Sequence, residues 1–242
     1  STYQFGAYNI DLMRAAARRS GSSVHNLLIA YSGRKPWDVK LKGMSAVGRG
    51  VDSLTNFYYG PSWNGHEKGW FNNPSNWYDN AELVREIGGA EDLLTSAKPI
   101  KAEIAILYSS STDIWTLKHN YAYGFDRMHN WLALTHAQIP VDIISEYDLE
   151  AGLLDEYRVC YFSGPNLTRK AAQKLQEWVN AGGTLILTAG AGSKDEYNQP
   201  LATLDNILPV QRASLEELQR FLSSGKYLDT LTTRDRVAVN GA

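Results

Sequence analysis

Four short segments in the second half of the chain are almost continuously apolar. They read EIAILY, VDIIS, RVCYF and TLILT, at residues 103–108, 141–145, 158–162 and 184–188. Runs of this kind are typical of strands that are buried on both faces of a parallel sheet. Amphipathic segments lie between them, so the pattern predicts a doubly wound parallel sheet of the flavodoxin-like or Rossmann-like kind.

The helices of this half are predicted from the spacing of their apolar residues and from capping residues at their ends. Residues 121–138 have a helical pattern. A second helix is predicted after Thr168, which can cap it, and Gly182 closes it. Beyond residue 205 we predict one more helix at 214–222 and a strand at 236–239.

The first half has the same alternation of helices and strands, but it contains only two strands. Helices are predicted at 11–19, 36–48 and 76–95, the last with Gly88 and Gly89 as candidate breakpoints, and strands at 25–31 and 52–59. Two parallel strands with flanking helices do not make a stable domain. We therefore expect residues 1–98 to start inside a larger α/β architecture, and residues 101–242 to form a second domain after a linker that contains Pro99.

Composition excludes several classes of protein. The 242 residues carry a net charge of −2 with no basic face, which argues against a nucleic-acid partner. No apolar run approaches the length of a membrane span, so no membrane partner is expected. The sequence does not determine the cellular compartment. A single cysteine allows no internal disulfide and no cysteine-based zinc site. The 7 Trp and 14 Tyr fit either a large core or a surface that stacks on sugar rings.

The second half offers little chemistry. It has no GxGxxG or Walker lysine, and AGAGS (189–193) suits a tight turn better than a small anion nest. Cys160 lies inside an apolar run and Ser163 lacks the GxSxG pattern, so acyl transfer is not expected. His119, His129 and His136 share one helical region without a carboxylate motif. We expect no metal and no cofactor.

The aromatic segment GPSWNGHEKGW (60–70) follows the second predicted strand of the first half. Sugar hydrolysis usually needs two carboxylates across the scissile bond. No glutamate precedes Glu67, and no aspartate stands at a predicted carboxyl end of a strand. The first half therefore cannot assemble a standard catalytic pair, and this loop is better suited to gripping a sugar than to cleaving it.

Several stretches together resemble the glycoside hydrolases of family 42, the β-galactosidase type. They are AVGRGVDSLTNFYYGPSWNGHEKGW (46–70), AEIAILY, VDIIS, YRVCYFSGPNLT, WVNAGGTLILT and DEYN. The resemblance covers about residues 5–215. It implies the end of a (β/α) TIM-type barrel in residues 1–98, followed in 101–242 by a flavodoxin-like, class I amidotransferase-like domain that helps to form trimers.

The resemblance also implies residue roles. Trp63, His66 and Glu67 match the loop that holds the sugar in the first subsite, and Trp70 and Tyr59 join them as substrate-binding candidates. The nucleophile position falls at Ala30 or Tyr31, and the acid/base residue falls before Ser1, so the catalytic residues stay unknown. Asp195 to Asn198 resembles a loop that lies near a neighbouring subunit in the family's trimer.

The resulting hypothesis is a part of a retaining glycoside hydrolase that supplies a sugar-binding rim and an oligomerisation domain. Its partners would be a carbohydrate substrate and either further copies of the chain, as in a trimer, or the rest of the barrel. The 242 residues alone are expected to be inactive. The alternative is a non-catalytic sugar-binding or oligomerisation module that has lost the carboxylates. A third hypothesis is an α/β domain whose aromatic loop only packs against the barrel.

Overall fold

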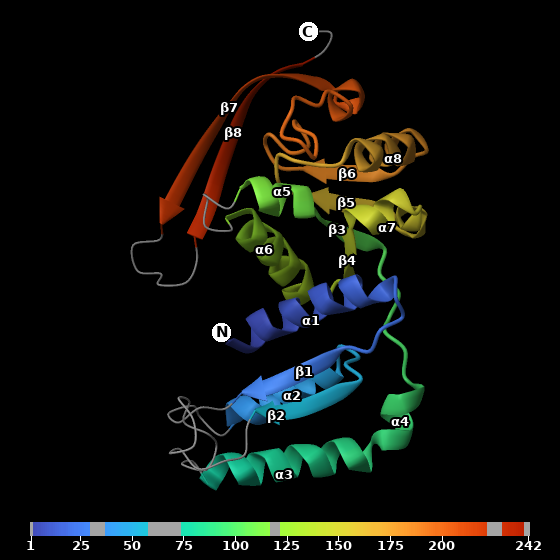
Figure 1. The fold of residues 1–242 in the computed structure, drawn as a ribbon, viewed down its shortest axis with the longest axis vertical. Coiled ribbons are helices and arrows are strands. Elements are labelled where there is room, and N and C mark those ends of the chain that lie inside the picture. The colour runs from blue at the N-terminus through green and yellow to red at the C-terminus, as the bar shows by residue number, and fades with distance from the viewer. Residues whose placement is uncertain (1, 30–36, 58–73, 117–121, 222–228, 240–242) are drawn as a thin grey trace. The chain divides into compact units, whose positions relative to one another are not determined.

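The computed structural model describes residues 2–29, 37–57, 74–116, 122–221 and 229–239 (Figure 1). The chain divides into two compact units, Ser1–Ile100 and Lys101–Ala242, which are described separately below. Both are mixed α/β, and each contains a parallel sheet.

The first unit alternates helices with two strands that pair in parallel, from His25 opposite Ser53 to Ile29 opposite Phe57. The predicted alternation is confirmed, with two differences. The first helix begins nine residues earlier than predicted, and the predicted helix at 76–95 divides after Gly89. The elements are α1 (Thr2–Arg18), β1 (His25–Ile29), α2 (Trp37–Val47), β2 (Ser53–Phe57), α3 (Pro74–Gly89) and α4 (Glu91–Ser96).

A small core joins β1 to α2 and α3. Leu28, Val39 and Leu83 are almost fully buried and touch one another. Gly43 lets α2 approach α3 closely, because a Cβ atom at this position would lie only 2.2 Å from Cδ2 of Leu83. Leu27, the neighbour of Leu28 on β1, is 48% exposed. One face of the two-stranded sheet is therefore covered, while the other face shows an apolar side chain to solvent.

The second unit is built on a four-stranded parallel sheet with the order β4-β3-β5-β6. All four predicted strands are confirmed to within two residues. Two short helices, α5 and α7, were not predicted. The elements up to the last parallel strand are β3 (Ile104–Tyr108), α5 (Ser110–Trp115), α6 (Ala122–His136), β4 (Val141–Ser145), α7 (Glu146–Glu150), η4 (Leu153–Glu156), β5 (Val159–Phe162), α8 (Arg169–Asn180) and β6 (Thr184–Leu187).

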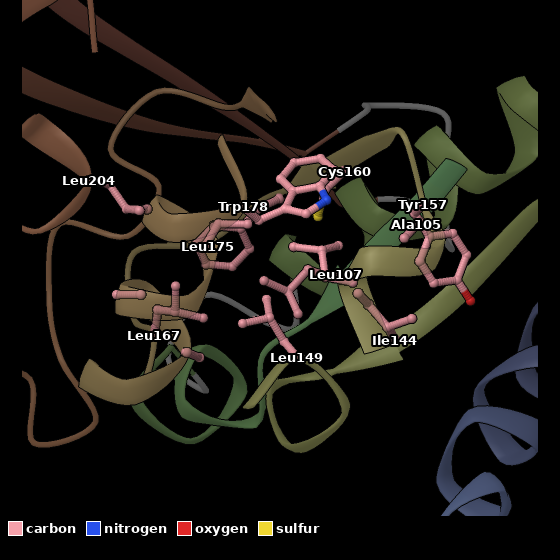
Figure 2. Packing of buried hydrophobic residues seen from close by; sticks show 14 of the residues in the cluster. Ala105, Leu107, Ile144, Leu149, Tyr157, Cys160, Leu167, Leu175, Trp178 and Leu204 are labelled. Atoms are coloured by element: carbon pink, nitrogen blue, oxygen red, sulfur yellow. The ribbon is translucent and has the colours of Figure 1, made fainter. Parts of the chain in front are cut away.

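The core of this unit lies between the sheet and the helices on one of its faces (Figure 2). Leu107 and Cys160 on the sheet are fully buried, as is Leu175 on α8. α8 begins as predicted, since the side chain of Thr168 accepts a hydrogen bond from the backbone N–H of Ala171. The capped helix buries its apolar face, which fastens α8 to the sheet.

A buried guanidinium ties α6 to the sheet and to α5. Arg127 is 3% exposed, and its Nη2 donates to both carboxylate oxygens of Asp113, at 2.9 and 2.8 Å. Its guanidinium also lies 4.8 Å from the centre of the Tyr108 ring. The paired charge and the aromatic face together make this buried cation tolerable.

The tail differs from the prediction. After η5 (Leu204–Ile207), residues of the predicted helix 214–222 instead form part of β7 (Val210–Phe221), so that prediction is wrong. β7 pairs antiparallel with β8 (Asp229–Val239), from Val210 opposite Val239 to Phe221 opposite Asp229. The predicted strand 236–239 is part of β8. Pairing with the following strand has overridden the local helical pattern.

Gly183 gives a prediction about this core. A Cβ atom at Gly183 would lie 2.3 Å from ring atoms of Trp178, which is itself 8% exposed. We expect Gly183→Ala to lower the free energy of unfolding by about 1–3 kcal/mol, because the indole must shift within a packed core. The midpoint of denaturant unfolding measures the change.

The matched control is a double-mutant cycle with Trp178→Leu. The smaller side chain makes room for the added methyl group, so Gly183→Ala should cost much less in that background. An equal cost in both backgrounds would contradict a steric origin.

Candidate functional site: the carboxyl edge of the parallel sheet

Ligands of doubly wound sheets bind where the strands end at their carboxyl side, at the point where the chain direction across the sheet reverses. In the second unit this point lies between β3 and β5, because β3 leads to β4 on one side and β5 leads to β6 on the other. The loops after β3, β4, β5 and β6 therefore form the candidate site.

The carboxylate of Glu146 is the central group of this edge. Glu146 follows β4 directly and is 2% exposed. Its Oε1 accepts from Ser109 Oγ at 3.2 Å and from the backbone N–H of Thr168 at 2.9 Å. Its Oε2 accepts from Ser110 Oγ at 2.9 Å and from both N–H and Oγ of Ser111 at 3.2 Å. A buried carboxylate is tolerated only when it is satisfied in this way.

Asn166, in the loop after β5, is a second buried hub. Its carbonyl oxygen accepts from Ser109 Oγ and Thr112 Oγ1, both at 2.7 Å. Its side-chain Nδ2 donates to the carbonyl of Asp195 at 3.0 Å and to Asn198 Oδ1 at 3.2 Å. Asn166 thus joins the loop after β3 to the loop after β6, across the point where a ligand would enter.

Neither candidate nucleophile is arranged for acyl transfer. Ser163 is 4% exposed, and its Oγ donates to the carboxylate of Asp126. Cys160 is fully buried, and this burial raises the pKa of its thiol to about 12. A neutral, inaccessible thiol is a poor nucleophile. The expectation that Cys160 behaves as a buried apolar side chain is confirmed.

The AGAGS segment after β6 is a tight turn and not an anion nest. The backbone N–H groups of Ala191, Gly192 and Ser193 donate to the carbonyls of Thr188, Gly164 and Gly190, at 3.1, 3.0 and 3.3 Å. Gly190 and Gly192 have φ of +74° and +66°, which glycine adopts without strain. These three amides are therefore already used within the turn and its neighbour.

The loop at 195–199 is organised by hydrogen bonds to the buried carboxylate of Asp195. Asp195 is 1% exposed; its Oδ1 accepts from the backbone N–H groups of Tyr197 at 2.9 Å and Gln199 at 2.8 Å, and its Oδ2 accepts from Arg169 Nε at 2.9 Å. Burial raises the pKa of the Asp195 carboxyl, but the hydrogen bonds from Gln199, Arg169 and Tyr197 outweigh it, so the pKa lies below its usual range.

Apolar side chains emerge beside this loop. The rings of Trp115 and Tyr197 are 45% and 65% exposed, and Ile114 next to Trp115 is 66% exposed. We call these two rings together with Ile114 the aromatic surface. The indole N–H of Trp115 donates to the carbonyl of Glu196 at 2.9 Å, which ties α5 to the loop. The guanidinium of Arg169 lies 5.7 Å from the centre of the Tyr197 ring. The rings are thus held in place while they face solvent.

The sugar-binding candidates named from the sequence are not part of this site. Tyr59, Trp63, His66, Glu67 and Trp70 fall at residues 58–73, outside the described residues. Their segment connects the carboxyl end of β2 to the start of α3. Their roles remain predictions.

Among the described residues, no three His, Cys, Asp or Glu side chains are grouped so that they could hold a metal ion. His129 is half-buried and His136 exposed on α6, while His119 lies outside the described ranges. No described helix is long and apolar enough to cross a membrane.

Sequence reasoning missed Glu146 and Asn166. The available signal was position: Glu146 comes directly after an apolar strand, and Asn166 lies in the turn after the next one. Parallel strands bring such positions to one edge. Nothing in the sequence showed that their partners would be the chain's own serines and backbone amides.

Comparison with known families identifies this unit. Residues 102–218 match the family model of the β-galactosidase trimerisation domain of glycoside hydrolase family 42. The second unit carries this trimerisation domain. The resemblance to family 42 that was inferred from the sequence is thereby confirmed.

Individual relatives agree with the trimerisation-domain match. The β-galactosidase BgaA of Clostridium cellulovorans is 28% identical over 211 residues, which cover 79% of this chain and 31% of the relative. The chain therefore spans about a third of the length of that relative.

Solved structures of family 42 share the fold. A β-galactosidase from G. stearothermophilus matches with a TM-score of 0.77 at 17% identity, over 98% of this chain and 38% of its own. A β-galactosidase from the psychrophilic Marinomonas ef1 matches with a TM-score of 0.69 at 18% identity, over 97% of this chain and 40% of its own.

Glu146 gives a prediction about the trimerisation domain. We expect Glu146→Gln to lower the free energy of unfolding by about 2–3 kcal/mol, because an amide NH₂ would face donors that now meet a charged oxygen. Glu103→Gln is the control: Glu103 is 69% exposed and pairs with the exposed Arg158, so its loss should cost less than about 0.5 kcal/mol. Equal effects in urea unfolding would contradict the central role of Glu146.

Proposed function

We propose that this chain serves a β-galactosidase-type glycoside hydrolase of family 42 in two ways. Its second unit joins copies of the protein, and its first unit supplies the last strands of the catalytic barrel together with a sugar-holding rim. The observation that carries the proposal is the match of residues 102–218 to the trimerisation domain.

The second unit is suited to a scaffold role. In chain order its parallel strands run second, first, third, fourth across the sheet, which supports a flavodoxin-like arrangement. The carboxyl edge that usually binds a ligand is spanned by the hydrogen bonds of Glu146 and Asn166. This bonded edge supports the proposal that the second unit associates with other copies of the protein and does not bind a small molecule.

The first unit has the features of a barrel end. Its two strands are parallel, and helices α2 and α3 cover the face that carries Leu28. The opposite face, with Leu27 exposed, corresponds to the interior that further strands of a closed barrel would fill. Alternate residues of a barrel strand point inward and outward, as Leu27 and Leu28 do.

The rim follows from the position of the aromatic loop. Barrel enzymes carry their active sites in the loops after the carboxyl ends of the strands, and residues 58–73 follow the carboxyl end of β2. We assign Trp63, His66 and Glu67, with Tyr59 and Trp70, to contacts with the sugar. The catalytic carboxylates of a retaining hydrolase would come from elsewhere in the whole protein, since Ala30 and Tyr31 follow β1.

The contact between copies is assigned to the aromatic surface. Tyrosine and tryptophan dominate the energetic centres of protein interfaces, and rings that are already held in place lose little entropy on binding. Tyr197 also lies in the DEYN segment that the family resemblance places near a neighbouring subunit. The comparisons favour this enzyme-associated role over a freestanding module.

The first test concerns association. We expect the purified chain to form a homo-oligomer in light scattering after size exclusion, and Tyr197→Ala to weaken that association about tenfold or more, as loss of a buried tyrosine commonly does. Tyr78→Ala is the control, because Tyr78 on α3 is 77% exposed but lies in the first unit. A monomeric parent chain, or equal loss in both variants, would count against this surface.

The second test concerns the sugar. We expect galactose to bind the chain without turnover of aryl-galactosides, and Trp63→Ala or Trp70→Ala to weaken binding by about three- to tenfold, since a ring contact is worth about 0.5–1.5 kcal/mol. Trp37→Ala is the control, because Trp37 on α2 is 61% exposed and outside the rim. Isothermal titration measures the affinity. Hydrolysis at enzyme-like rates by the chain alone would overturn this assignment of the carboxylates.

A further inference from the structure

We propose that residues 214–221 have two alternative structures: a strand while they pair with β8, and a helix when that pairing opens. This inference is independent of the proposed function. It starts from a conflict between the local sequence and the observed strand, and such conflicts mark segments that can change structure.

The sequence of the segment specifies a helix start. Ser214 is followed three residues later by Glu217, which is the capping-box pattern in which each side chain bonds the other's backbone N–H. Leu215 and Leu218 are spaced for one helical face. Glu216 and Arg220 are spaced for an attractive i,i+4 pair.

The structure nevertheless has this segment as part of β7. Among the described residues its sheet partner is β8 alone, with Leu218 opposite Thr232 and Glu217 opposite Thr233. β8 is rich in strand-forming residues, with the sequence DTLTTRDRVAV. The partner strand therefore imposes the extended structure on residues that would locally prefer a helix.

The ribbon of β7 and β8 is fastened near the start of the segment. Arg212 Nη1 donates to the carbonyl of Ala191 at 2.8 Å, and Arg212 Nε pairs with Asp205 at 3.0 Å. Leu215 packs against Gly190, where an added Cβ atom would lie 2.5 Å from Leu215 Cδ2. These contacts lie at the position where the helix would begin, so the chain can stay anchored while the following residues change structure.

The energetics favour an accessible second state. A two-stranded ribbon is marginally stable by itself. Figure 1 shows β7 and β8 as a long ribbon that runs past the parallel sheet, and α6 is a helix that β8 contacts. Val237 and Val239 of β8 are 52% and 63% exposed, so packing adds little at these positions. A helix in the opened state recovers backbone hydrogen bonds, which lowers the cost of opening.

The decisive test is hydrogen exchange of the β8 amides in the intact chain. Ser214→Ala removes the helix cap, which is worth about 1 kcal/mol, and so raises the free energy of the opened state alone. We expect protection of the amides at 229–239 to increase about fivefold. Ser214→Asp keeps a good cap and should match the parent chain. Unchanged or lower protection in Ser214→Ala would overturn the proposal, because an unstructured opened state does not need a cap.

A second variant opens the ribbon permanently. Thr232→Pro with Thr233→Pro removes two adjacent backbone N–H groups, one of which must face β7. We expect the Cα chemical shifts at 215–221 to change sign from the strand to the helix direction, and to return toward coil values when Ser214→Ala is added. Coil or strand shifts in the double-proline chain would overturn the proposal. Protection of the β3–β6 amides verifies that the rest of the unit is folded.

Discussion

The buried carboxylate of Glu146 is the group on which the carboxyl edge of the second unit depends. One charged group takes hydrogen bonds from the loop after β3 and from the cap of α8 while it sits at the end of β4. Burying a charge is expensive unless donors surround it, and here the donors come from two separate connections, the one after β3 and the one before α8. The same bonds that satisfy the charge therefore fix those connections relative to one another.

This network extends outward to the surface. Asn166 shares Ser109 with Glu146 and reaches Asp195 and Asn198 in the loop after β6. Asp195 in turn binds Arg169, whose guanidinium lies over the Tyr197 ring. An exposed ring that is fixed by buried bonds is pre-organised for a contact, because little freedom is lost when a partner covers it. The polar groups that form this order are thereby engaged with one another.

The parts of the fold that could be read from the sequence are those whose signal is local. Ile104–Tyr108 and Val141–Ser145 are continuous apolar runs, and a buried parallel strand has few other sequence forms. The strand at Val210–Phe221 could not be predicted, since its local pattern indicates a helix and its structure depends on pairing with Asp229–Val239. Glu146 could not be assigned either, because a glutamate after a strand looks the same whether solvent or three serines surround it.

The two units differ in the chemistry at the carboxyl ends of their strands. In the second unit the polar groups at the carboxyl ends of the strands bond to one another, and the rings of Trp115 and Tyr197 beside them are exposed. In the first unit the sheet is covered on one face only, and the aromatic segment 58–73 follows the carboxyl end of β2. Sugar contact needs polar groups and rings that are free to meet a ligand, whereas association needs rings on a rigid base. The chemistry of each edge is therefore the basis for proposing that the first unit contacts the sugar and that the second unit contacts other copies.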